Sequence, residues 1–429
     1  AADVTLADGA DLITASAGTS NLRLGVNAGN SIVSSGNYNV VVGDEAGTAI
    51  TTGDYNTAVG MDSAKAITTG IKNTAIGSTA LDAEVAGNYS TAIGMGALTT
   101  QSQSGDVDVY NTAVGYNAGA SVTTGIQNTL IGSSAGDSLT DADFNVAIGN
   151  DALASDTLGS RSIAIGRRTL LSQNFTSATD TYNVAVGFEA GHDITTGLRN
   201  TLIGGFAGDA LTDADDNVAV GTYALSSDTQ GSRSVAIGKE ALVAQNFTSA
   251  TNAYNTAVGA FAGNAVTTGV ENTLIGGLAG DALTDADFNV ALGSRALGAD
   301  TLGSRSIAIG RSTLGTQNFT SATDAYNVAV GYEAGVSLTT GVQNTLIGGL
   351  AGDSLTDADF NVAVGVSALG ADTLGSKSTA LGYFALSVQN FTSATDVYNV
   401  AVGHGAGAAV TTGRFNNLIG GLAGDALTD

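Results

Sequence analysis

One nine-residue motif recurs 23 times along this chain of 429 residues, and the fifth position of every copy is glycine. The clearest copy runs from Asn344 to Gly352. Position 1 is Asn or Ser, positions 2 and 4 are almost always apolar or Thr, and position 8 is small. A repeat this dense means that each copy forms one structural unit, which is stabilised by contacts with the neighbouring copies.

The copies follow one another at regular intervals. After a first interval of 18 residues, the motif starts are separated by 17, 17, 17 and 21 residues in a recurring cycle, which defines a super-repeat of 72 residues. Residues 1–20 do not match the motif and are predicted to form an entry segment or cap. Residues 21–429 are predicted to form one continuous repeat domain. Because the chain stops part-way through a super-repeat, we expect the natural protein to continue beyond it.

The motif predicts an all-β fold. Positions 2 and 4 favour β-structure and alternate around position 3, and the invariant glycine then forces a bend or a close backbone approach. No segment has a sustained helical period, and the chain contains no proline, which central strands exclude. We therefore predict a parallel β-solenoid of about 23 coils, with coils of 17, 17, 17 and 21 residues.

Position 3 of the motif is an apolar column. It is Ala in 16 copies, Leu in 5, Val at Val41 and Arg only at Arg23. If positions 2 and 4 point into the coil, position 3 points outward and forms an exposed apolar stripe, which predicts packing between identical chains as a dimer or trimer. The alternative is that position 3 lines a second internal face of a flattened coil.

Composition limits the partners. The chain has 14 basic and 39 acidic residues, a net charge of −25, so it would repel nucleic acid. No apolar run approaches the length of a membrane span, and we predict that the chain does not span a membrane. The absence of cysteine excludes disulfides and thiolate catalysis.

The residues that could carry catalysis do not form a recognisable set. The only histidines are His192 and His404, which occupy different positions of the motif and do not combine into a Ser-His-Asp arrangement. Carboxylates recur in every super-repeat, whereas an active site needs one unique constellation. We predict a protein that is not an enzyme and has no catalytic residues. The alternative is a tailspike that degrades polysaccharide with paired carboxylates.

An acidic segment follows the second motif of each super-repeat and is a candidate calcium site. Asp side chains and loop carbonyls would suit Ca²⁺, and binding would relieve the repulsion between stacked acids. The segment partly resembles glycine- and aspartate-rich calcium repeats, although its spacing differs, and the other interpretation is a solvated acidic loop. The candidate ligands are Asp209, Asp213, Asp215, Asp281, Asp285 and Asp287.

The four additional residues of the 21-residue coils predict a bulge that presents an aromatic ring once per super-repeat. These rings are candidate contacts for a repetitive glycan or another fibre, and they belong to Phe175, Phe247, Phe319 and Phe391. An ice-binding surface is a weaker interpretation, because pairs of Thr residues such as Thr339 and Thr340 recur mostly only once per super-repeat.

Two forms of the motif resemble known repeats. Ser162 to Gly166, Ser-Ile-Ala-Ile-Gly, resembles the head repeats of YadA-like trimeric autotransporter adhesins, and Thr339 to Gly352 resembles repeats of bacteriophage tail fibres. The resemblance covers about residues 21–424, although the coils are longer than those of YadA heads. It implies a homotrimeric fibre shaft that is extracellular, at a cell surface or on a virion, and that mediates attachment to a host or cell-surface glycan or protein. A calcium-binding solenoid surface protein is the alternative function.

Overall fold

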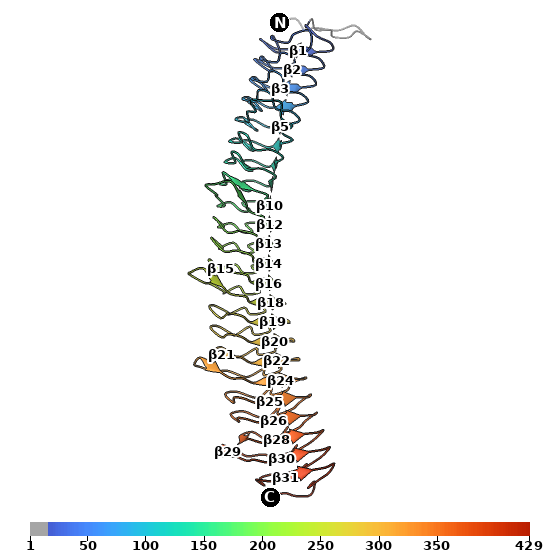
Figure 1. Cartoon of the computed structure of the whole chain (residues 1–429), viewed down its shortest axis with the longest axis vertical. Helices are drawn as coiled ribbons and strands as arrows, with labels where there is room; N and C mark the ends of the chain where they lie inside the picture. Colours follow the sequence, from blue (N-terminus) through green and yellow to red (C-terminus); the bar gives the residue numbers. More distant parts are fainter. Residues whose placement is uncertain (1–15) are drawn as a thin grey trace, which may run out of the picture. The chain divides into compact units, whose positions relative to one another are not determined.

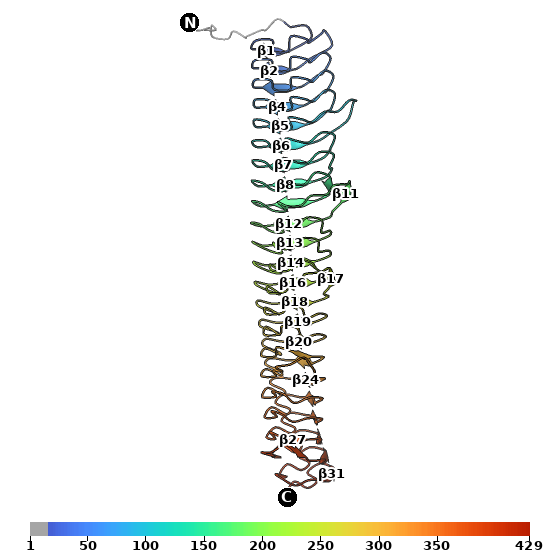
Figure 2. The ribbon, with the colours of Figure 1, turned by 90° about the vertical axis from the view of Figure 1, so that its left-hand side faces the viewer.

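A computed structural model describes residues 16–429 of the chain, and these residues contain strands and turns but no helix. They fall into two compact units, Ala1–Arg199 and Asn200–Asp429. Within each unit, Figures 1 and 2 show one short strand per coil, stacked on the strand of the next coil. In the predicted entry segment, residues 17–20 form a bend, and residues 1–15 lie outside the described part.

The strands of the first unit are three residues long, apart from one pair of two-residue strands. They are β1 (Leu22–Leu24), β2 (Val40–Val42), β3 (Thr57–Val59), β4 (Thr74–Ile76), β5 (Thr91–Ile93), β6 (Thr112–Val114), β7 (Thr129–Ile131), β8 (Val146–Ile148), β9 (Gly159–Ser160), β10 (Ile163–Ile165), β11 (Thr179–Asp180) and β12 (Val184–Val186).

The second unit continues the same pattern, with three pairs of two-residue strands. Its strands are β13 (Thr201–Ile203), β14 (Val218–Val220), β15 (Gly231–Ser232), β16 (Val235–Ile237), β17 (Thr251–Asn252), β18 (Thr256–Val258), β19 (Thr273–Ile275), β20 (Val290–Leu292), β21 (Gly303–Ser304), β22 (Ile307–Ile309), β23 (Thr323–Asp324), β24 (Val328–Val330), β25 (Thr345–Ile347), β26 (Val362–Val364), β27 (Gly375–Ser376), β28 (Thr379–Leu381), β29 (Thr395–Asp396), β30 (Val400–Val402) and β31 (Asn417–Ile419).

Each three-residue strand consists of motif positions 2 to 4 and pairs in parallel with the same positions of the next coil. In β19 and β20, for example, Thr273 faces Val290 and Leu274 faces Ala291. The two-residue strands pair in the same way beside four of the 21-residue coils, as Gly303 does with Thr323. The first 21-residue coil has a single parallel bridge instead, between Asn88 and Asp108. The predicted parallel β-solenoid, with about 23 coils of the expected lengths, is confirmed.

The prediction that position 3 points outward is wrong. The side chains at this position are fully buried, as at Ala257 and Leu274, whereas those at positions 2 and 4 are partly exposed. Side chains alternate along a strand, so Asn at position 1 and the residue at position 3 both point inward. The alternative reading, in which position 3 lines an internal face, is therefore the correct one. The apolar outward face consists instead of positions 2 and 4.

The interior is narrow, and positions 3 and 9 fill it by size complementarity. Where position 3 is Ala, position 9 is often Leu, as for Ala236 and Leu242, both fully buried. Where position 3 is Leu274, position 9 is glycine in the same coil and in the coil before it. A Cβ at Gly280 or Gly263 would lie 2.7 Å from a methyl group of Leu274, so neither glycine has room for a side chain.

A ladder of buried asparagines connects the coils. The side chain of Asn344 donates to the carbonyl oxygen of Ala358 at 2.8 Å, and its Oδ1 accepts from the backbone N–H of Asn361 at 3.0 Å. Asn344 in turn donates its backbone N–H to Oδ1 of Asn327 at 2.9 Å. Most motif copies repeat these contacts, so the first motif position satisfies backbone groups that the coil corner would otherwise bury without partners.

A second buried network occurs in the third and fourth coils of the super-repeat, around a carboxylate. Asp372 is fully buried; its Oδ1 accepts from the backbone N–H groups of Gly375 and Phe391, and its Oδ2 accepts from Gln389 at 2.6 Å. The Gln389 side chain also accepts from Asn399, which ties the carboxylate to the asparagine ladder. Asp156, Asp228 and Asp300 form the same contacts in three other super-repeats, and the buried Glu84 takes the place of the aspartate in the first.

The Asp372 carboxyl makes the stability of the second unit depend on pH. Burial raises the pKa of Asp372 above its ordinary value, against the effect of its hydrogen bonds. The folded state therefore holds this proton more tightly than the unfolded state does, and the contribution of Asp372 to stability falls as pH rises from about 4 through the folded pKa. Relative to Asp372→Asn, the wild type is expected to lose stability over that window in urea titrations at a series of pH values. Parallel pH profiles for the two proteins would contradict this expectation.

Candidate functional site

The outward side of each strand is a surface without charge. Position 4 is Val, Ile or Leu in every coil, and position 2 is Val, Ile, Leu or Thr in all but the last. These side chains are partly exposed; Ile203 and Ile347 are 40% and 38% accessible. We call positions 2 and 4 of the strands within one unit the outer face of that unit. Because a contiguous apolar surface is unusual on an acidic protein, it is a candidate interaction surface.

The candidate calcium ligands lie in the acidic segment but form contacts with the neighbouring coil. Asp285 accepts from the hydroxyl of Thr268 at 2.5 Å, and Asp287 accepts from the backbone N–H of Val270 at 2.8 Å. Burial raises the pKa of the half-buried Asp281, while a hydrogen bond to its backbone and the charge of Arg295 act against that shift. In residues 16–429, no group of three or more His, Asp or Glu side chains is placed to hold a metal ion.

Asp209, Asp213 and Asp215 hold the equivalent places one super-repeat earlier. Calcium binding by the six aspartates stays a prediction, and a melting experiment can check it. If they bind calcium, Tm is expected to rise when calcium is added and to return on chelation with EGTA, because the ion stabilises only the folded segment. An unchanged Tm over the full calcium titration would contradict calcium binding.

The expected exposure of the four phenylalanines is wrong, because their rings are buried. Phe175, Phe247, Phe319 and Phe391 are only 5–7% accessible. The ring of Phe319 packs on the preceding coil, where a Cβ at Gly303 would lie 2.6 Å from it. The exposed part of the insertion is the polar tip that follows the ring, such as Thr320 and Ser321. These rings therefore anchor the bulge and are not exposed to a ligand. Contact between the rest of the insertion and a ligand stays a prediction.

The two histidines have different surroundings. The Nδ1 of His192 lies 2.6 Å from a carboxylate oxygen of the adjacent Asp193, and His404 stacks on Tyr383 with ring centroids 5.2 Å apart. Neither contact includes the hydroxyl of a serine. The His404 ring is thus a local surface contact, whereas Nε2 of His192 is buried without a hydrogen-bond partner in the described part of the chain.

A column of aromatic and cationic side chains precedes the strands. In the second unit, the Arg305 guanidinium lies 4.8 Å from the ring of Phe288 and 5.9 Å from that of Tyr326, and it pairs with Asp324 at 2.8 Å. The column therefore combines cation–π contacts with an ion pair. They are exposed contacts of modest strength and help to hold the coils in register.

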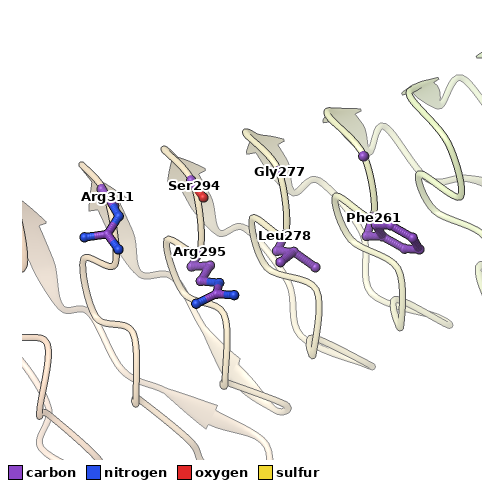
Figure 3. Close-up of a pocket in the computed structure, with 7 residues that line it drawn as sticks. Phe261, Gly277, Leu278, Ser294, Arg295 and Arg311 are labelled. Atoms are coloured by element: carbon purple, nitrogen blue, oxygen red, sulfur yellow. The ribbon is translucent and has the colours of Figure 1, made fainter.

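Sequence analysis did not identify a shallow groove that lies beside β18 to β22. Figure 3 shows Phe261, Leu278 and Arg295 side by side on three successive coils, with Arg311 on the fourth. We call this hollow of about 450 Å³ the basic groove, and it is lined by Ala260, Phe261, Gly277, Leu278, Ser294, Arg295 and Arg311. A smaller hollow on the other side of Arg295 includes Asp281 and Gly298.

Gly277 opens the groove, although the backbone does not require glycine there. A Cβ at this position would have one neighbour within 4 Å, the carbonyl oxygen of Ala260 at 4.0 Å, and the residue does not have a positive φ. Gly349 and Gly421 occupy the same place in the following super-repeats with the same free space. The signal in the sequence is thus a glycine at position 6 of the second motif that occurs only in the later super-repeats, since Met61 and Ser133 hold this position in the first two.

Of three cations near the groove, one has no ion-pair partner in the described part of the chain. Lys239, which lies over the ring of Phe261, is 3.1 Å from a carboxylate oxygen of Glu240, and Arg311 is 3.3 Å from one of Glu333. Arg295 forms no ion pair within residues 16–429. Arg295 is also exposed. The groove therefore places an available guanidinium beside an aromatic ring and an apolar side chain.

Comparisons with known proteins do not assign a family. A scan against models of protein families finds no match, and a search of curated proteins finds no similar sequence. No helix in residues 16–429 is long and apolar enough to cross a membrane.

Proposed function

We propose that the protein is a non-enzymatic structural and adhesive shaft of an extracellular fibre, on a cell surface or a virion, and that its chains associate through the outer face. The outer face is the observation that carries this proposal. In each unit it combines unbroken parallel pairing along the strands with a surface of Val, Ile, Leu and Thr, and such a surface favours burial against another apolar surface. A homotrimer, as the resemblance to adhesin and tail-fibre repeats implies, is the proposed assembly.

The stacked coils support a mechanical role. Each coil exchanges backbone hydrogen bonds with the next, and size complementarity and the asparagine ladder fix the register within each unit. A solenoid of this kind can be lengthened by adding repeats, so it suits a spacer that carries binding surfaces. Attachment to a host or cell-surface glycan or protein is the proposed purpose of the shaft.

Charges placed on the outer face are expected to separate the chains. The triple variant Val330→Lys, Ile347→Lys and Val364→Lys changes position 4 in three successive coils, where each side chain points outward. Burying three ammonium groups without partners costs several kcal/mol, so the assembly should dissociate while the coils stay folded. Light scattering after size exclusion should give a multiple of 42.1 kDa for the wild type and 42.1 kDa for the variant.

A matched control adds the same charge elsewhere. Thr176→Lys, Thr248→Lys and Thr320→Lys change exposed residues in the insertions and are expected to leave the assembly intact. The proposal would be contradicted by a wild-type chain that is monomeric at every concentration, or by assembly that survives the outer-face substitutions.

A further inference from the structure

The basic groove differs from the rest of the acidic surface because two arginines lie together in it. The chain carries a net charge of −25, yet this site brings Arg295 and Arg311 together on adjacent coils. In the next super-repeat, the positions of Arg295 and Arg311 are occupied by Ser367 and Tyr383, so the repeat itself does not require the two cations. The cations therefore need an explanation beyond the stacking of coils.

The shape of the groove indicates a flat, partly apolar ligand with one negative charge. Gly277 leaves the centre open, Phe261 and Leu278 supply apolar walls, and Arg295 has no ion-pair partner among residues 16–429. A planar guanidinium can bind a carboxylate through two parallel N–H···O bonds, and an aromatic ring can pack against the C–H face of a sugar. A sugar that bears a carboxylate could therefore contact both the ring of Phe261 and the guanidinium of Arg295.

We infer that the basic groove binds a polysaccharide with spaced carboxylate groups, with one acidic sugar over Gly277 between Phe261 and Arg295. The carboxylate accepts hydrogen bonds from Arg295, and Arg311 adds a second positive charge. The polymer runs across the coils, because the residues that line the hollow lie on four successive coils (Figure 3). Charges must be spaced along the polymer, because a dense polyanion such as nucleic acid is repelled by the chain as a whole. This inference rests on the proposed attachment function and names its ligand class.

Affinity electrophoresis of the full chain in gels containing hyaluronan, which carries a carboxylate on alternate sugars, tests the inference. Arg295→Gln is expected to weaken binding about tenfold, because it removes a charge-assisted hydrogen bond. Gly277→Tyr should weaken it as much by filling the centre of the groove, where a Cβ has free space. Neutral chitin oligosaccharides should not compete.

Two variants are controls for folding and charge. Gly349→Tyr adds the same side chain at the equivalent place, with the same 4.0 Å clearance but no neighbouring arginine pair, and should bind like the wild type. Arg414→Gln removes one exposed charge outside the groove and should also have no effect.

Several results would overturn the inference. These are equal retardation of wild type and Arg295→Gln, an equal loss for Gly277→Tyr and Gly349→Tyr, or binding of polyglutamate as tight as that of hyaluronan, which would indicate an acidic peptide. If Gly277→Tyr instead changes the oligomeric mass without affecting retardation, the groove is a contact between copies. The proposed assembly of the shaft is tested by the mass measurements on the outer-face variants. A groove that does not bind hyaluronan would therefore leave the proposed assembly unaffected.

Discussion

Replacing Gly276 by alanine is expected to unfold the coils around it, with a loss of about 4 kcal/mol in the free energy of unfolding. The residue has φ of +137°, a conformation that L side chains rarely adopt, and a Cβ there would lie 2.6 Å from the backbone carbon and oxygen of Gly293. Backbone strain of about 1–3 kcal/mol and overpacking of similar size add to the expected loss. Because the obstacle is backbone of the next coil, it cannot move aside without breaking the ladder.

The neighbouring glycine supplies a stringent control. Gly277→Ala introduces the same methyl group one residue later, where φ is not positive and the space is open. Its effect on stability should stay within about 1 kcal/mol and can be stabilising, because alanine restricts the unfolded chain. Urea titrations followed by circular dichroism would measure both variants. Equal midpoints for the two would show that the close approach of consecutive bend glycines does not limit the fold.

Asn344→Ala is expected to cost about 3 kcal/mol, the second largest effect. The substitution leaves the carbonyl oxygen of Ala358 and the N–H of Asn361 without their side-chain partner in a buried place. Each such group costs about 1–3 kcal/mol when it is unsatisfied. Thermal and urea unfolding would give the loss, and hydrogen exchange at Asn361 should accelerate because its N–H loses its acceptor.

An exposed asparagine provides the comparison for Asn344. Asn318 accepts a hydrogen bond from the hydroxyl of Thr301 at 3.0 Å but lies at the surface, so water can replace the contact. Asn318→Ala should change stability by no more than about 0.5 kcal/mol. If both substitutions have the same small effect, the buried asparagine ladder does not contribute the stability that its geometry implies.

The sequence predicted the coil but not which side of the strand lies inside it. Motif spacing, the bend glycine and the lack of a helical period together determine a parallel solenoid, and the strands fall on positions 2 to 4 as expected. The orientation was wrong because large apolar residues were assumed to fill the interior. The interior is too narrow for Val and Ile at two positions of one strand, so it takes Ala or Leu at position 3 and leaves the β-branched residues outside.

The candidate sites show what a repeat pattern alone cannot reveal. Phe319 and its equivalents suggested exposed rings because insertions usually lie at the surface, but the ring packs into space left by Gly303. The basic groove depends on side chains that occur in only one super-repeat, such as Arg295. Such side chains are not visible in a pattern of residues that all super-repeats share. Gly277 was nevertheless visible in the sequence as a recurring glycine, and only the backbone geometry distinguishes it from the required Gly276.

The pairing of Leu274 with two glycines also limits how such a chain can change its length. If the single coil of residues 255–271 were deleted, the coil containing Leu242 would precede the one containing Leu274, and two large side chains would compete for space that now holds Leu274 and Gly263. Removal or duplication of a complete 72-residue block restores a compatible neighbour at both junctions. A change of length by a whole block therefore keeps the packing around Leu274, whereas loss of the single coil before it does not.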